Sequence, residues 1–197
     1  MFQDSSEPLT IKLLFLGDLH VGKSSFIHRY IEDKFTNDRM TTTDLDLKTA
    51  DIIIEDKNIR VQLWDTAGQE RYKSISKNLI SRVQGILILF DITNENSFTN
   101  LNAWLKTIKD QDGKMPIIMV GNKCDLEEKR VVKKEDAKTF AKNEKMKYIE
   151  TSCKTGENVK NTIDIFCKHI MKNTNLKNEI SFSLDSTEPI IKNKKCC

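Results

Sequence analysis

Hydrophobic residues fall into short runs up to residue 171, and the spacing within these runs is of two kinds. Nearly continuous apolar runs are typical of buried strands, and they occupy residues 9–16, 85–91, 115–120 and 148–151. Helical spacing predicts helices at residues 21–31, 70–82, 94–110, 133–145 and 159–171. Residues 48–56 and 58–65 predict a hairpin that turns at 55–58. Strands that alternate with helices predict an α/β domain with a mostly parallel sheet.

The last part of the chain has a different character. Residues 172–197 are polar, rich in Asn, Ser and Lys, and contain Pro189. Because this segment lacks a sustained periodicity, we expect it to be a flexible tail. The predicted organisation is a flexible N-terminus at 1–8, one domain at 9–171 and the tail at 172–197.

Composition narrows the class of protein. A chain of 197 residues suits one compact domain, and a net charge of +3 gives no sign of nucleic-acid binding. No apolar run approaches the roughly 20 residues of a transmembrane helix, and we expect no signal peptide. The five cysteines lack metal-ligand spacing, which favours reduced thiols in the cytosol.

A phosphate-binding motif follows the first predicted strand. Residues 17–24 read Gly-Asp-Leu-His-Val-Gly-Lys-Ser, which matches G-x-x-x-x-G-K-[ST] between a strand and a helix. Such a loop turns consecutive backbone N–H groups and a helix N-terminus toward phosphates. We expect Lys23 to bridge the β- and γ-phosphates and the Ser24 hydroxyl to bind Mg²⁺. The other nucleotide-binding residues predicted here are Gly17, Leu19, His20, Val21, Gly22 and Ser25.

A second motif ends the hairpin. Residues 64–70 read Trp-Asp-Thr-Ala-Gly-Gln-Glu, and Asp65 closes an apolar strand. A carboxylate at this position can hold the same Mg²⁺ through water. Gly68 gives the backbone the freedom to donate its N–H group to a γ-phosphate.

Two later loops predict a base-binding site. Asn-Lys-Cys-Asp at 122–125 follows one strand, and Ser-Cys-Lys at 152–154 follows the next. Asp125 can accept hydrogen bonds from guanine N1–H and the 2-amino group, which adenine lacks, so discrimination of about 10⁴–10⁵ is attainable. We expect Asn122 at N7, Lys123 along the ring and the Cys153 N–H at O6. The full predicted set is Phe35, Asn122, Lys123, Asp125, Ser152, Cys153 and Lys154.

With these motifs in this order, residues 9–171 resemble the Ras superfamily. The likeness is greatest to its Rab branch, through Trp-Asp-Thr-Ala-Gly-Gln-Glu-Arg-Tyr at 64–72, Phe-Asp-Ile-Thr at 90–93, Asn-Ser-Phe at 96–98 and a terminal Cys-Cys. The resemblance implies the small G-domain of a P-loop NTPase, with a six-stranded sheet flanked by about five helices. It also implies a GTP/GDP switch that controls vesicle and membrane trafficking.

The resemblance also implies a catalytic set of Lys23, Thr42 and Gln69. Thr42 falls on the switch I threonine that binds Mg²⁺ and senses the γ-phosphate, although the run of threonines at 41–43 leaves this uncertain by one residue. Gln69 falls on the glutamine that orients the attacking water. Hydrolysis is then slow alone and is accelerated by an arginine supplied in trans.

Three features depart from the family pattern. Residues 43–47 read Thr-Asp-Leu-Asp-Leu in place of Ile-Gly-x-Asp-Phe, and residues 79–83 lack the usual aromatics. The hydrophobic effector surface would therefore be Leu47, Trp64 and Leu79, which suggests a divergent member. Leu19 stands where the family usually has a small residue beside the γ-phosphate, and we hypothesise that its bulk slows hydrolysis.

The end of the chain predicts a membrane anchor. Cys196 and Cys197 suit double prenylation, and three nearby lysines would add attraction to an anionic surface. By resemblance we expect a monomer at the cytoplasmic face of an intracellular membrane that cycles with the cytosol. Its expected partners are an exchange factor, a GTPase-activating protein, effectors, an escort protein and a dissociation inhibitor.

Two other function classes stay open at this point. One is a nucleotide-dependent binding module with little or no hydrolysis, for which Leu19 and the altered residues 43–47 are the signs. The other is a P-loop kinase, but the paired guanine motifs and the lack of an evident acceptor-binding lid argue against it. We therefore expect a regulatory GTPase.

Overall fold

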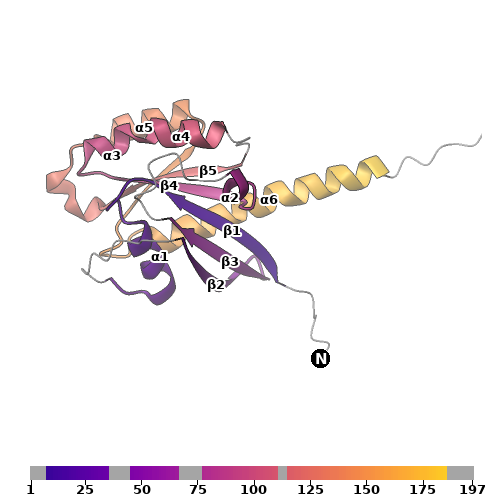
Figure 1. Cartoon of the computed structure of the whole chain (residues 1–197). Helices are drawn as coiled ribbons and strands as arrows, with labels where there is room; N and C mark the ends of the chain where they lie inside the picture. Colours follow the sequence, from indigo (N-terminus) through magenta and orange to yellow (C-terminus); the bar gives the residue numbers. More distant parts are fainter. Residues whose placement is uncertain (1–7, 36–44, 67–76, 111–114, 186–197) are drawn as a thin grey trace, which may run out of the picture.

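The computed structural model describes residues 8–35, 45–66, 77–110 and 115–185. It contains a six-stranded sheet of order β2-β3-β1-β4-β5-β6, with helices on both faces (Figure 1). The strands are β1 (Leu9–Leu16), β2 (Asp46–Ile54), β3 (Lys57–Asp65), β4 (Gly85–Asp91), β5 (Ile117–Asn122) and β6 (Lys147–Thr151). Every neighbouring pair is parallel except β2 with β3. The predicted α/β fold with a mostly parallel six-stranded sheet is confirmed.

The helices connect the strands in the order that the apolar spacing predicted. They are α1 (Lys23–Glu32), α2 (Lys77–Ile80), α3 (Glu95–Thr99), α4 (Leu101–Lys109), α5 (Lys134–Asn143) and α6 (Val159–Asp185), with a 3₁₀ helix η1 (Cys124–Lys129). The predicted helix at 94–110 is divided at Asn100 into α3 and α4. The Asn94 side chain begins α3 by accepting a hydrogen bond from the Ser97 N–H at 3.3 Å.

Two helical ends differ from the prediction. The α6 helix runs to Asp185, whereas the apolar spacing predicted an end at residue 171 and a flexible tail from 172. The first part of the predicted tail is therefore helical, because no glycine or proline interrupts the chain between Met171 and Asp185. Of the predicted helix at 70–82, the described part is α2, since residues 67–76 lie outside the described residues.

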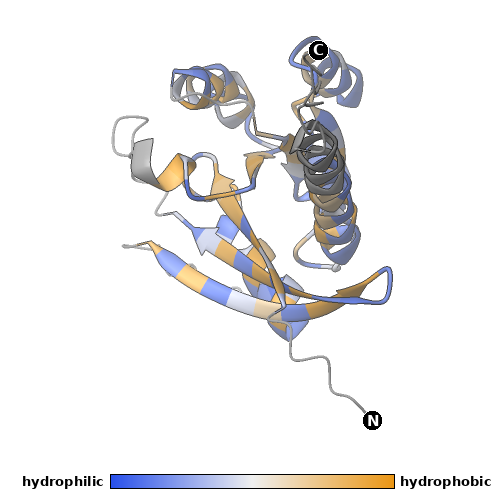
Figure 2. Ribbon diagram, turned by 90° about the vertical axis from the view of Figure 1, so that its right-hand side faces the viewer, coloured by the Kyte–Doolittle hydropathy of each residue, from blue (hydrophilic) through white to orange (hydrophobic). Residues whose placement is uncertain are grey.

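Each face of the sheet has its own hydrophobic core. One core packs β1 and β3 against α1 and α6, with Phe15, Phe26 and Phe166 fully buried. The other packs β4 and β5 against α4 and α5, with Phe90 and Trp104 among its largest members. Figure 2 shows hydrophobic segments gathered where strands and helices face one another. Burial on both faces explains why every residue of β4 is buried.

The hairpin of β2 and β3 turns at Glu55 and Asp56. Both residues have left-handed backbone angles, with φ of 50° and 61°, as the tight turns that suit the twist of two paired strands require. The strands pair from Asp46 opposite Asp65 to Ile54 opposite Lys57.

Within the described residues, no helix combines the length and the apolar character needed to span a membrane.

Candidate nucleotide-binding site

The five parallel strands bring the predicted motifs to one edge of the sheet. Phe15 of β1 lies opposite Asp65 of β3, and Asn122 of β5 lies between Asp91 of β4 and Thr151 of β6. Because parallel strands share the direction of their carboxyl ends, the loops that follow β1, β5 and β6 meet there. This edge is where ligands bind in open α/β sheets.

The phosphate loop is closely packed at its two glycines. A Cβ atom on Gly17 would lie 2.2 Å from the Leu89 carbonyl oxygen, and one on Gly22 would lie 2.3 Å from Asn122 Nδ2. Both glycines also have positive φ, at 135° and 99°, a backbone conformation that residues with a Cβ atom rarely adopt. His20, between them in the chain, adopts a left-handed φ of 62° despite its side chain.

Lys23 lies in the first turn of α1, and its side chain folds back over the loop. Its ammonium donates hydrogen bonds to the carbonyl oxygens of Gly17 at 2.8 Å and Asp18 at 3.0 Å. The residue is only 5% exposed. The charge is therefore held against the backbone whose N–H groups are expected to face the phosphates.

The described part of the predicted magnesium site consists of two oxygen-bearing residues. Asp65 ends β3 and is 4% exposed, and Ser24 lies in the first turn of α1. The Thr66 hydroxyl donates to the Phe15 carbonyl at 2.8 Å, which holds the chain after Asp65 against β1. A hydroxyl and a carboxylate at the mouth of a phosphate loop are ligands that Mg²⁺ prefers, so the residues present fit this ion. Thr42, Gly68 and Gln69 lie outside the described residues.

Asn122 is the buried centre of the predicted base site. Its Nδ2 donates to the Val21 carbonyl in the phosphate loop at 2.8 Å. Its Oδ1 accepts from the Thr151 hydroxyl at 3.2 Å and the Cys153 thiol at 3.3 Å. One side chain that is 1% exposed thus connects β5, the phosphate loop and the loop after β6. These bonds give Asn122 a loop-fixing role, and its contact with guanine N7 stays a prediction.

Asp125 and the Ser-Cys-Lys loop are brought together. The Ser152 hydroxyl donates to Asp125 Oδ1 at 2.6 Å and accepts from the Thr155 N–H at 3.1 Å. This bond orients the carboxylate that is predicted to recognise guanine. Burial raises the pKa of the Cys153 thiol to about 12, so the thiol stays protonated and serves as a packed donor to Asn122.

Lys123 has a partner that the sequence pattern did not predict. Its ammonium forms an ion pair with Asp91 Oδ2 at 2.5 Å, while Asp91 Oδ1 accepts from the N–H and hydroxyl of Thr93 at 2.8 and 2.7 Å. Asp91 and Thr93 belong to the Phe-Asp-Ile-Thr segment at 90–93. Because the ammonium is paired with Asp91, the predicted packing of Lys123 along the base would be made by the methylene groups of its side chain.

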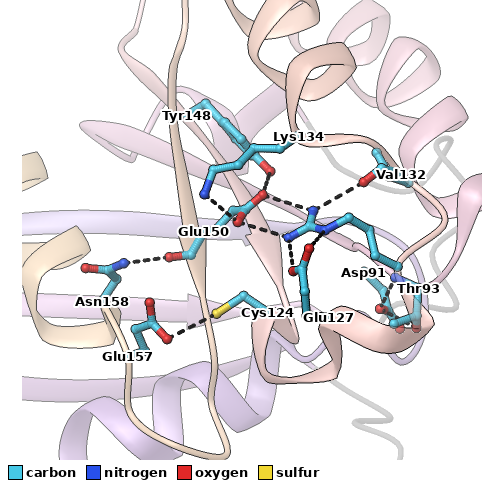
Figure 3. A network of polar contacts seen from close by, with 11 residues as sticks. Asp91, Thr93, Cys124, Glu127, Val132, Lys134, Tyr148, Glu150, Glu157 and Asn158 are labelled. Carbon is cyan, nitrogen blue, oxygen red and sulfur yellow. Dashed lines mark hydrogen bonds and ion pairs between the residues drawn. The ribbon is translucent and has the colours of Figure 1, made fainter.

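A network of polar contacts surrounds the Glu150 carboxylate next to the base loop, as Figure 3 shows. Arg130 donates to both carboxylate oxygens of Glu150 at 3.1 Å, and Lys134 and the Tyr148 hydroxyl reach the same carboxylate at 3.1 and 2.7 Å. Burial alone would raise the pKa of Glu150, but the bonds from Tyr148, Arg130 and Lys134 outweigh it and hold that pKa below its usual value. Glu127 binds Arg130 from the solvent side at 2.6 Å.

Of the other predicted residues, Leu19, Phe35 and Leu47 are exposed, whereas Trp64 and Leu79 are partly buried. Leu19 and Phe35 are each 37% exposed, at the phosphate loop and after α1 respectively. Leu47 lies opposite Trp64 across β2 and β3, and Trp64 and Leu79 both pack against the second core. The structure thus places the proposed effector residues on adjoining elements. Cys196 and Cys197 lie outside the described residues, and the described cysteines are free thiols.

Several residues at the site were missed by the sequence patterns. The Asp18 carboxylate accepts from Asn100 Nδ2 and Trp104 Nε1, and Arg29 binds the loop after β6. None of these belongs to a nucleotide motif, and their roles come from contacts between distant segments. One sign of the role of Arg29 was available in the sequence, because a charged residue on the apolar face of a predicted helix needs polar partners.

Comparison with known proteins agrees with this arrangement. The model of the Ras family matches residues 12–172. The Ras-related protein Rab-13 of Rattus norvegicus is 39% identical over 164 residues, which cover 83% of this chain and 81% of the relative. The Ras-related protein Rab-3A of Homo sapiens is 36% identical over 197 residues, which cover 98% of this chain and 85% of the relative.

Proposed function

This chain belongs to the Ras family as a Rab-type small GTPase that hydrolyses GTP, and we propose that its partners change with the bound nucleotide. The observation that supports this site most directly is the set of bonds made by Asn122. Because they join the phosphate loop to the loop after β6, the phosphate and base subsites form one connected unit. A ligand that spans both would be a guanine nucleotide.

The phosphate end would be bound by residues that are already oriented. Lys23 would turn its ammonium, now held by two loop carbonyls, toward the β- and γ-phosphates. Ser24, Asp65 and Thr42 would hold Mg²⁺, which neutralises developing phosphate charge when it is bound. Leu19, His20, Val21 and Ser25 would contribute backbone or neighbouring contacts.

Hydrolysis would depend on positioning and charge stabilisation. Gln69 would orient the attacking water, and an arginine from an activating protein would complete the charge stabilisation. Loss of the γ-phosphate would release contacts at Thr42 and Gly68, and so loosen both switch segments. The surface of Leu47, Trp64 and Leu79 would then change its fit to effectors.

The setting of this cycle would be membrane trafficking at the cytoplasmic face of an intracellular membrane. Two prenyl groups on Cys196 and Cys197 would give stable anchoring, since a single lipid chain is marginal. Three lysines before them would each add about 1 kcal/mol at an anionic surface. An escort protein and a dissociation inhibitor would allow cycling with the cytosol, and an exchange factor would reload GTP.

Single-turnover hydrolysis of bound GTP tests this proposal. We expect the parent chain with Mg²⁺ to hydrolyse slowly and Gln69→Leu to be slower by at least about tenfold, because an oriented water is lost. Gln62→Leu, the same change within β3, is the matched control and should retain the parent rate. Equal GTP retention by the parent and Gln69→Leu would contradict the role of Gln69.

A further inference from the structure

Arg29 connects the two ends of the base site. It lies in the last turn of α1, and its side chain is 14% exposed. Its Nε donates to the Cys153 carbonyl at 2.8 Å and its Nη2 donates to the Lys154 carbonyl at 2.7 Å. The rigid fork of a guanidinium can hold two successive carbonyls in fixed directions, which a lysine ammonium cannot.

These bonds fix the backbone on one side of Cys153. On the other side, the Ser152 carbonyl accepts from the Gly156 N–H at 2.8 Å, and the Ser152 N–H donates to the Glu157 carbonyl at 3.1 Å. Because the Ser152 carbonyl and the Cys153 N–H belong to the same planar peptide, both planes that flank Cys153 are held. The direction in which the Cys153 N–H bond points is therefore fixed.

The same guanidinium also holds the end of α1. Its Nη1 donates to the Asp33 carbonyl at 2.8 Å and to Asp33 Oδ1 at 3.2 Å. Asp33 has a left-handed φ of 51°, and its N–H donates a hydrogen bond to the Arg29 carbonyl at 3.1 Å. Phe35, which is predicted to pack on the base, follows two positions later. One side chain thus sets the base loop against the segment that carries Phe35.

We propose that Arg29 is a positioning residue that gives this site its selectivity for guanine, by directing the Cys153 N–H at the O6 atom. The inference rests on the proposed function. Guanine presents an acceptor at this position, whereas adenine presents an amino group. A fixed N–H donor forms a hydrogen bond with guanine O6 but faces the donating amino group of adenine. Two donors that face each other are costly when buried. A mobile loop would lose that distinction.

The test compares the affinities of GDP and ADP for the full chain and its variants. We expect Arg29→Met to weaken GDP binding by about tenfold or more, as loss of charged hydrogen bonds does. ADP binding should change far less, so that the ratio of the two affinities falls about tenfold. Arg29→Lys, which keeps the charge but loses the fork, should show most of this fall. Arg60→Met is the matched control, because Arg60 pairs with Asp51 on the exposed hairpin.

The ratio separates a positioning role from a merely structural one. If Arg29→Met weakens GDP and ADP equally, or changes neither, the inference is wrong, since Arg29 would then support the fold alone. Where Arg29→Met does not fold, Arg29→Lys and Arg29→Gln decide the matter by the same ratio. Failure of the proposed function has a different signature, in which the parent chain itself shows no preference for GDP.

Discussion

Trp104 Nε1 donates a hydrogen bond of 2.9 Å to Asp18 Oδ1. Asn100 Nδ2 donates to the other oxygen of this carboxylate at 2.7 Å. The phosphate loop is therefore held from the side by a helix, α4, that carries none of the predicted nucleotide contacts. The two donors also draw the negative charge of Asp18 toward α4, while its backbone carbonyl faces the Lys23 ammonium.

Loss of either donor should therefore loosen the phosphate loop. We expect Trp104→Phe and Asn100→Ala each to speed GDP dissociation by about three- to tenfold, because a partly buried carboxylate loses a hydrogen bond. The measurement is the release rate of a fluorescent GDP analogue. Asn102→Ala removes an asparagine side chain from α4, two positions after Asn100, where among the described residues it donates to the local Thr99 carbonyl at 3.2 Å, and it should leave the rate unchanged.

Gly22 should not accept a side chain. A Cβ atom there meets Asn122 Nδ2 at 2.3 Å, and the backbone has a φ of 99°. We expect Gly22→Ala to displace Asn122 and to reduce GDP affinity by at least about a hundredfold, since strain and a broken buried bond combine. Gly156→Ala shares the positive φ, but its Cβ would meet Arg29 Cδ at an ordinary 3.7 Å, so we expect it to reduce GDP affinity less, through the Gly156 N–H that holds the Ser152 carbonyl. Equal losses of GDP affinity in both variants would show that backbone strain alone is responsible.

Glu150 should stabilise the protein in a pH-dependent way. Since its pKa is held below the usual value, its contribution is present above the ordinary glutamate pKa of about 4.3 and is lost as pH falls through the folded-state value. We expect Glu150→Gln to lower the free energy of unfolding by about 1–3 kcal/mol at pH 7. This gap should narrow below about pH 4, as measured by urea unfolding.

Glu127→Gln is the matched control for this experiment. Glu127 binds the same Arg130 guanidinium, but its side chain is 67% exposed, and solvent screens exposed pairs. Its effect on the free energy of unfolding at pH 7 should be smaller. If both variants lose the same free energy, burial of the Glu150 carboxylate has no special consequence.

Cys124 should react slowly despite its place in the base loop. Burial, followed by the nearby carboxylate of Glu157, raises the pKa of its thiol to about 12. The thiolate fraction at pH 8 is then about a thousandfold below that of an ordinary cysteine. We expect iodoacetamide to label Cys124 in the folded chain at a correspondingly low rate, rising about tenfold per pH unit. Peptide mass spectrometry measures this, with urea-unfolded chain as the reference, and fast labelling at pH 8 would contradict it.

Leu19 should slow GTP hydrolysis. Leu19 is 37% exposed within the phosphate loop, and the proposed roles of Gln69 and of an activating arginine require both to approach the γ-phosphate close to it. We expect Leu19→Gly to raise the single-turnover hydrolysis rate by about tenfold or more, because positioning dominates this chemistry. If the intrinsic hydrolysis rate and the rate with an activating protein both stay unchanged in Leu19→Gly, Leu19 does not hinder hydrolysis.

The sequence predicted those features that local patterns encode. Strands such as β4 have continuous apolar runs, and the phosphate loop has glycines at fixed spacing, so both were predictable. The loops at 122–125 and 152–154 were also predicted to form one base site, whereas the hydrogen bond from Ser152 to Asp125 within that site was not predicted.

Contacts that depend on side-chain direction across long separations were not predictable. Nothing in the local sequence of Arg29 indicates that it reaches the Cys153 carbonyl, and Lys123 has no local sign of its pairing with Asp91. The length of α6 was missed for a different reason. A polar composition indicated a tail, but composition does not end a helix in the absence of glycine, proline or a cap.

The helix α1 carries Lys23 in its first turn and Arg29 in its last. Each further residue in a helix adds about 1.5 Å and turns the following side chain by about 100°. A single insertion between these two positions would rotate Arg29 away from the loop after β6 while Lys23 stayed in place. The number of residues between these two cations is therefore set by the separation of the phosphate loop and the loop after β6, which α1 spans.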